Sequence, residues 1–167
     1  MTSTGAHGID TPSLLSWFSG AGRPLPWRED GVTAWEILLC EVMSQQTPVA
    51  RVEPVWRDWL ARWPGPAELA AAAPADVIRM WGKLGYPRRA LRLRECAAVV
   101  VDEFHGEVPT EVDDLLTLPG VGDYTARAVA CFAHGQAVPV VDTNVRRVVA
   151  RAVNGVAEAG PPSSRRD

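Results

Sequence analysis

Residues 118–122, with the sequence LPGVG, constrain the fold of this chain more than any other segment. A proline and two glycines do not continue a helix, yet an amphipathic stretch over residues 123–134 follows them directly. Gly120 and Gly122 permit a tight turn and a close approach of the backbone to a ligand. The free amides at the start of the next helix attract an anion. The segment therefore predicts a hairpin between two helices that can hold a phosphate, with a plain interhelical turn as the alternative.

Most of the remaining chain has the apolar periodicity of helices, interrupted by proline and glycine. The stretch over residues 33–46 is apolar on nearly every side, which predicts a central helix. An alternating pattern is confined to a short linker, residues 136–141. The expected fold class is therefore an all-α helical bundle. We expect helices over residues 12–20, 33–46, 49–62, 66–72, 74–83, 87–104, 123–134 and 143–153.

The pattern predicts one domain over residues 11–154, flanked by two disordered ends. Residues 1–10 lack apolar periodicity, and residues 155–167 are mostly Gly, Pro, Ser and charged. No apolar run is long enough to cross a bilayer, and the N-terminus does not have the composition of a secretory signal. We therefore expect a cytoplasmic protein with no membrane partner.

One helix offers a specific prediction about the core. In residues 87–104 the apolar positions indicate which side chains point inward. The expected inward residues are Leu91, Cys96, Ala98, Val99 and Val100.

The three cysteines are Cys40, Cys96 and Cys131, and they lie far apart within apolar helical patterns. This spacing matches neither a disulfide framework nor a metal site, so reduced and buried thiols are expected. We expect no metal ligands in this chain.

Charge alone does not indicate a nucleic-acid-binding protein, because the net charge is −3. The distribution is more informative. Basic residues form two clusters, one over residues 88–94 and one over residues 146–151, while acidic residues gather in 102–114. The alternative interpretation is that both basic clusters are solvated helix faces.

Glu41 is an unusual acid because it interrupts the apolar helix of residues 33–46. Burial favours the neutral carboxyl, so its pKa is expected to be raised and the group can donate a proton near neutral pH. The alternative is a partly exposed glutamate with no task. Gln45 and Gln46 follow on the same helix, and their amides can hydrogen-bond to base edges.

Asp142 stands at the start of the helix over residues 143–153, where it is expected to act as an N-cap. The helix N-terminus also favours the ionised carboxylate. A neutral acid and an ionised carboxylate together suit cleavage of a glycosidic bond through an oxocarbenium-like transition state. With a phosphate-binding hairpin, the bond indicated is an N-glycosidic bond in DNA.

Several motifs together resemble the helix-hairpin-helix DNA glycosylases. LPGVGDYTARAVACFA matches the hairpin and its following helix, and VVDTNVRRVVAR matches the segment that bears the aspartate. LPWR, EVMSQQT and KLGYPRRALRL resemble the MutY-type adenine glycosylases within that superfamily. The resemblance spans about residues 12–153, and it implies a monomer that removes adenine opposite 8-oxoguanine or guanine in double-stranded DNA after flipping the base. It also implies a bacterial, nucleoid-associated protein.

The resemblance assigns a role to each matching residue. Glu41 would protonate the adenine, and Asp142 would stabilise the sugar cation with help from Tyr124 and Asn144. Tyr124 stands where the endonuclease III relatives carry a Schiff-base lysine, which implies no amine-driven strand cleavage. The residues implied to contact DNA are Arg28, Gln45, Gln46, Tyr86, Leu118, Gly120, Val121 and Gly122.

The chain departs from the family pattern in two respects. Ser44 replaces the leucine usual in the EVMLQQT motif. The four-cysteine loop for a 4Fe-4S cluster and the domain that recognises 8-oxoguanine are missing, so the bundle is expected to be C-terminally truncated and the cluster is expected only in a full-length form. Two alternatives stay open: a thymine or uracil mismatch glycosylase of the same superfamily, and an inactive DNA-binding remnant.

Overall fold

The computed structural model describes residues 8–160, and all the regular structure in this part of the chain is helical. The chain divides into two compact units. We call residues 25–140 the central unit, and residues 8–24 together with 141–160 the terminal unit. The all-α fold class expected from the sequence is confirmed.

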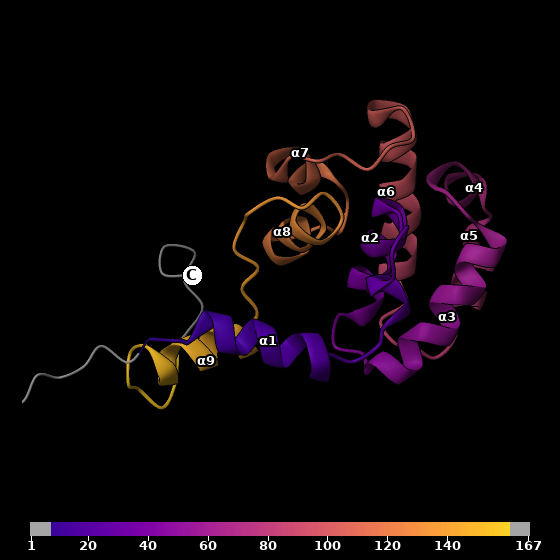
Figure 1. The fold of residues 1–167 in the computed structure, drawn as a ribbon. Coiled ribbons are helices and arrows are strands. Elements are labelled where there is room, and N and C mark those ends of the chain that lie inside the picture. The colour runs from indigo at the N-terminus through magenta and orange to yellow at the C-terminus, as the bar shows by residue number, and fades with distance from the viewer. Residues whose placement is uncertain (1–7, 161–167) are drawn as a thin grey trace, which may run out of the picture. The chain divides into compact units, whose positions relative to one another are not determined.

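The central unit contains a short 3₁₀ helix and seven α-helices (Figure 1). Its hairpin is formed by two helices on either side of residues 118–122, as the sequence predicts. The elements are η1 (Pro26–Arg28), α2 (Ala34–Ser44), α3 (Val49–Arg62), α4 (Pro66–Ala71), α5 (Pro74–Trp81), α6 (Arg88–Phe104), α7 (Val112–Thr117) and α8 (Asp123–Phe132).

Helix α2 is the centre of this unit, because it packs against η1, α3, α6 and α8 (Figure 1). Its start is held by a capping box, in which the Thr33 side chain accepts from the Glu36 amide and the Glu36 carboxylate accepts from the Thr33 amide. Seven of its eleven residues are buried apolar side chains. The prediction of a central helix is confirmed.

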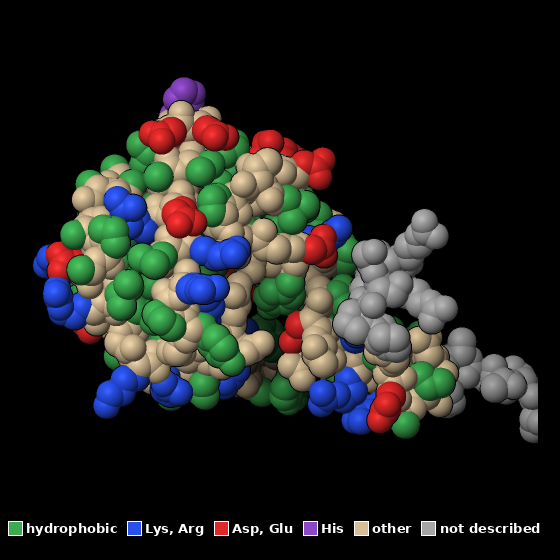
Figure 2. Space-filling model, turned by 180° about the vertical axis from the view of Figure 1, so that it is seen from behind, with side chains coloured by type: hydrophobic (Ala, Val, Ile, Leu, Met, Phe, Trp, Pro, Cys, Tyr) green, Lys and Arg blue, Asp and Glu red, His purple; other side chains and the backbone are tan. Residues whose placement is uncertain are grey.

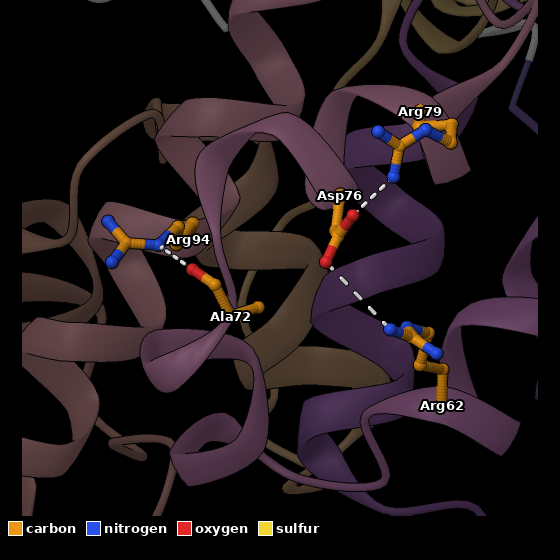
Figure 3. A network of polar contacts seen from close by, with 5 residues as sticks. All are labelled: Arg62, Ala72, Asp76, Arg79 and Arg94. Atoms are coloured by element: carbon orange, nitrogen blue, oxygen red, sulfur yellow. Dashed lines mark hydrogen bonds and ion pairs between the residues drawn. The ribbon is translucent and has the colours of Figure 1, made fainter.

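Tryptophans and arginines join α3, α4, α5 and α6 into one layer. The ring of Trp59 lies edge-on to those of Trp63 and Trp81, with centroids 5.1 and 5.5 Å apart. On α6, the Arg94 Nε donates to the carbonyl oxygen of Ala72 at 2.6 Å, which satisfies a free carbonyl after α4 (Figure 3). Nearby, the carboxylate of Asp76 pairs with arginines from α3 and α5 (Figure 3).

The inward face of α6 differs from the one expected. Cys96 and Val100 are buried as predicted, but Leu91, Ala98 and Val99 are only half-buried. Helices α4, α5 and α2 all pack on α6 and together cover a face that is shifted from the expected one. The fully buried residues are Ala90, Leu93, Cys96, Ala97 and Val100.

The terminal unit contains α1 (Thr11–Ala21) and α9 (Thr143–Ala152). Helix α1 has no buried residue, and α9 has only Ala150. Residues 155–160 are irregular and hydrogen-bond back to α9, since the Val156 amide donates to the Ala150 carbonyl at 3.0 Å. The rest of the predicted disordered ends, residues 1–7 and 161–167, lies outside the described residues. Within residues 8–160, no helix has the length and apolar character that a membrane span requires.

Candidate functional site

Glu41 is a partly buried carboxyl group in the central unit whose pKa is raised. It lies in the second half of α2, among residues that are almost fully buried. Desolvation raises the pKa of Glu41 to about 7 from its ordinary 4.5, and the positive charge of Arg28 opposes this shift. The carboxyl is therefore about half protonated at neutral pH, as a general acid requires. The expectation of a raised pKa agrees with the structure.

The hairpin holds its backbone outward by burying its apolar side chains. Leu118 and Val121 are 2% and 9% exposed, so they anchor the turn in the core rather than face a ligand. The Val121 amide donates to the Leu118 carbonyl at 3.1 Å and closes the turn. Gly120 has φ 84°, and a Cβ there would lie 3.1 Å from the Cβ of Arg92 on α6. Glycine is therefore required at 120 for both conformation and space.

The other hairpin glycine has a different environment. Gly122 is exposed, and nothing lies within 4 Å of the position that a Cβ would occupy. It directly precedes α8, whose first amides have no partner within the helix. This open backbone next to a helix N-terminus is an arrangement that suits a phosphate.

The two neighbouring glutamines are placed differently. The Gln45 amide donates to the buried hydroxyl of Thr125 on α8 at 3.3 Å, so this side chain joins α2 to the hairpin helix. Gln46 is exposed, with φ 54°. Tyr86 is also exposed, at 67%, with φ 48°. Of the side chains expected to probe a duplex, Gln46 and Tyr86 are exposed on the surface, whereas Gln45 is hydrogen-bonded to Thr125.

A cavity of about 250 Å³ lies among the end of α2, the start of α6 and the hairpin. Its lining includes Gln45, Arg89, Arg92 and Gly120. Figure 2 shows basic side chains nearer the start of α6 and acidic ones toward its end. Arg92 thus places a positive charge beside Gly120 of the hairpin, while Asp123, which follows the hairpin directly, is paired with Arg127 on α8.

Asp142 belongs to the terminal unit, where both of its oxygens have partners. Oδ1 accepts from the Val145 amide at 2.7 Å, and Oδ2 accepts from the Asn144 side-chain amide at 3.0 Å. The predicted N-cap of α9 is therefore present. Tyr124 lies in the first turn of α8 in the central unit and is 39% exposed.

The described cysteines do not fit the four-cysteine cluster of the longer family members. Burial raises the pKa of the Cys40 and Cys96 thiols, which keeps them protonated rather than as the thiolates that ligate metals. No group of three or more His, Cys, Asp or Glu side chains within residues 8–160 is arranged to hold a metal ion.

Two partners in the site were not identified from the sequence. Thr125 is the buried acceptor for Gln45, and Arg89 bonds to the backbone at the end of α2. From the sequence, the arginines at residues 88–94 were interpreted only as a basic cluster or a solvated helix face. Nothing in its spacing distinguishes an arginine that points inward from one that points outward.

Comparisons with known proteins identify the family of the chain. A family model described as "HhH-GPD superfamily base excision DNA repair protein" matches residues 39–162. The adenine DNA glycosylase of Mycolicibacterium smegmatis is 63% identical over 159 residues, which are 95% of this chain and 54% of that protein. The chain therefore spans about half the length of the curated relatives it matches.

Two solved structures share the fold at 28% identity. A thermostable thymine-DNA glycosylase has a TM-score of 0.78 and is matched over 83% of this chain and 64% of its own. A non-covalent complex of endonuclease III with DNA has a TM-score of 0.73 over 84% and 64% of the two chains. The resemblance to helix-hairpin-helix glycosylases is thereby confirmed.

Proposed function

The chain belongs to the HhH-GPD superfamily of base excision DNA repair proteins, and we propose that it hydrolyses the N-glycosidic bond of adenine mispaired with 8-oxoguanine or guanine in DNA. The observation that carries this proposal is the partly buried Glu41 within the apolar helix α2, whose pKa of about 7 suits a general acid. The similarity to the mycobacterial adenine DNA glycosylase supports adenine as the base.

In the proposed reaction the flipped adenine meets the carboxyl group of Glu41. The carboxyl proton passes to a ring nitrogen of the base, and the bonding electrons of the C1′–N bond leave with the adenine. The deoxyribose is left as an oxocarbenium-like cation. Water then adds to C1′ and returns a proton to the Glu41 carboxylate, which restores the enzyme. The products are free adenine and an abasic sugar.

Asp142 is proposed to stabilise the sugar cation. Its carboxylate is held in one orientation by the Val145 amide and the Asn144 side chain, and this fixed geometry avoids reorganisation during the reaction. Tyr124 and Asn144 are proposed to assist in positioning. With no lysine in the adjoining sequence, hydrolysis by water is favoured over an amine-driven strand break.

The proposed substrate is held by the hairpin backbone, with Gly122 next to the phosphate and Arg28 beside the extruded base. Gln46 and Tyr86 are proposed to enter the duplex at the mispair. The protein would act as a monomer on chromosomal DNA, in keeping with a cytoplasmic, nucleoid-associated location. A 4Fe-4S cluster is proposed only for a longer form of the protein.

Base release from an 8-oxoguanine:adenine duplex tests the proposal. Glu41→Gln removes the proton donor, and Asp142→Asn removes the negative charge while keeping a good N-cap. Each is expected to lower the single-turnover rate by about 10²- to 10⁴-fold. Glu53→Gln on α3 alters an exposed carboxylate and should leave the rate unchanged. Equal release by wild type and both site variants would overturn the proposal.

The same assay separates the two alternatives. A mismatch glycosylase of the thymine or uracil type would release T or U, and not A, from a panel of these bases opposite guanine. The structural similarity to a thymine-DNA glycosylase is the observation that keeps this candidate in the panel. A chain that binds the duplex and releases no base is a DNA-binding remnant.

A further inference from the structure

Two turns of the central unit each hold a bulky residue in the left-handed region. In the α2 turn (residues 44–47) the Thr47 amide donates to the Ser44 carbonyl at 3.1 Å, and Gln46 has φ 54°. In the α6 turn (residues 84–86) Tyr86 has φ 48°. Such conformations favour glycine, and they persist elsewhere only where surrounding contacts determine them. Some contact must therefore hold each turn.

Arg89 supplies that contact to the α2 turn. It lies in the first turn of α6, and its Nη1 donates to the carbonyl oxygen of Val42 at 3.0 Å, of Met43 at 3.3 Å and of Gln45 at 2.6 Å. These carbonyls lie at the end of α2, where only that of Val42 also accepts a backbone amide, from Gln45 at 3.4 Å. A cation at this position also interacts favourably with the negative end of the helix dipole.

The same guanidinium group holds the α6 turn. Its Nη2 donates to the carbonyl oxygens of Leu84 and Gly85, each at 3.1 Å, and to the Thr47 hydroxyl at 3.2 Å. The charged carbon lies 5.6 Å from the centroid of the Tyr86 ring, which adds a cation–π contact. One side chain thus bonds to both turns, although about forty residues of sequence separate them.

We propose that Arg89 is a positioning residue that locks the α2 turn and the α6 turn into one rigid edge. The exposed side chains of Gln46 and Tyr86 would then meet the duplex as a pair with a fixed separation. This inference rests on the proposed function. Arg89 itself is engaged with the backbone, so its effect on DNA passes through the two turns.

The chemistry of the side chain explains why arginine is required. A planar fork with several donors can reach acceptors in two turns at once, whereas an ammonium group has three donors at one point. Arg89→Lys therefore keeps the charge and loses the link, and Arg89→Met loses both. Arg94 provides a matched control on the same helix, because its guanidinium bonds to the Ala72 carbonyl, away from both turns (Figure 3).

Hydrogen exchange of the 167-residue chain without DNA tests the link directly. Arg89→Met and Arg89→Lys are expected to raise exchange by about tenfold in both turns together, because opening one turn releases the other. Arg94→Met should leave both turns unchanged while exchange near Ala72 rises. An increase confined to one turn, or the same pattern in Arg94→Met, would overturn the proposal. Arg89→Lys keeps the positive charge, so it tests the link even if Arg89→Met does not fold.

DNA assays then test the consequence for recognition. For Arg89→Lys, the preference in binding for an 8-oxoguanine:adenine duplex over a fully paired one is expected to fall about tenfold. The single-turnover rate at saturating enzyme should fall by less than in Glu41→Gln, because Glu41 is untouched. A rate loss equal to that of Glu41→Gln with an unchanged preference would contradict a positioning role. If the wild type releases no adenine, the proposed function fails, and the exchange measurement still decides whether Arg89 links the turns.

Discussion

Apolar side chains of the central unit and of the terminal unit have opposite environments. In the central unit Leu38 is 0% exposed, whereas Leu15 on α1 is 62% exposed and Val148 on α9 is 53% exposed. The two carboxylates of the proposed reaction are therefore held by different physical effects. Packing of α2 desolvates Glu41 and sets its pKa, while hydrogen bonds at a helix end orient Asp142.

The largest effect on stability is expected from removing a buried leucine, and it tests this contrast in packing. Leu38→Ala should destabilise the protein by about 2 to 5 kcal/mol, since it removes buried methyl groups and leaves a cavity. Leu15→Ala should change the unfolding free energy by less than about 0.5 kcal/mol, because its side chain is already in water. Urea unfolding of both variants measures the difference. Similar losses in the two variants would show that α1 is as tightly packed as α2.

A smaller effect on stability is expected from the carboxyl group of Glu41, which is partly buried. The pKa of Glu41 is about 7 in the folded chain and 4.5 ordinarily, so between these pH values the folded state holds a proton that the unfolded state has released. Stability from this group is complete below about pH 4.5 and is lost as pH rises through about 7. Glu41→Gln should abolish that loss and raise stability at pH 8 by on the order of 2 to 3 kcal/mol.

Thermal melts of the wild type and Glu41→Gln at pH 5 and pH 8 provide the measurement. Glu53→Gln, which alters an exposed residue, serves as the control. A parallel pH dependence in wild type and Glu41→Gln would mean that Glu41 is hydrated in the folded protein. The expected gain in stability, combined with loss of base release, would identify Glu41 as a residue kept for function at a cost in stability.

The smallest effect on stability is expected from removing the two helix caps, at Thr33 and Asp142. Thr33→Ala breaks the capping box of α2 and should lower the global unfolding free energy by about 1 kcal/mol, because α2 is the centre of the core. Asp142→Ala removes a cap of similar strength from α9. Since α9 buries only Ala150, this change should raise hydrogen exchange within α9 and leave the global melt almost unchanged. A large fall in the melting temperature of Asp142→Ala would contradict this separation.

Local patterns predicted the helices well because their signals are local. The expected helix over residues 49–62 coincides with α3, and the other expected helices differ by one or two residues at an end. Helix α7 (Val112–Thr117), which precedes the hairpin, was not predicted. Proline, glycine and capping residues mark these ends without reference to distant parts of the chain. The prediction of which residues of α6 point inward was partly wrong, because apolar residues cover more than one side of that helix. The neighbouring helices α4, α5 and α2 decided which side of α6 is buried.

The same distinction applies to the candidate site. The acid at Glu41 was predictable because a carboxyl group within an apolar helix is rare. Gln45 and Gln46 are adjacent and chemically identical, so no local rule separates the one that bonds to Thr125 from the one that is exposed. The role of Arg89 was likewise hidden, since its partners in the α2 turn lie more than forty residues away.

By itself, the sequence determined where most helices begin and end and where the hairpin turns, and it indicated the candidate residues for the proposed chemistry. Those properties depend on backbone preferences and on the spacing of apolar residues along one segment. Only the tertiary structure decided how strongly Glu41 is desolvated and which polar side chains turn inward. These depend on packing between segments distant in sequence, because desolvation and hydrogen-bond partners are set by whatever lies within a few ångströms in space.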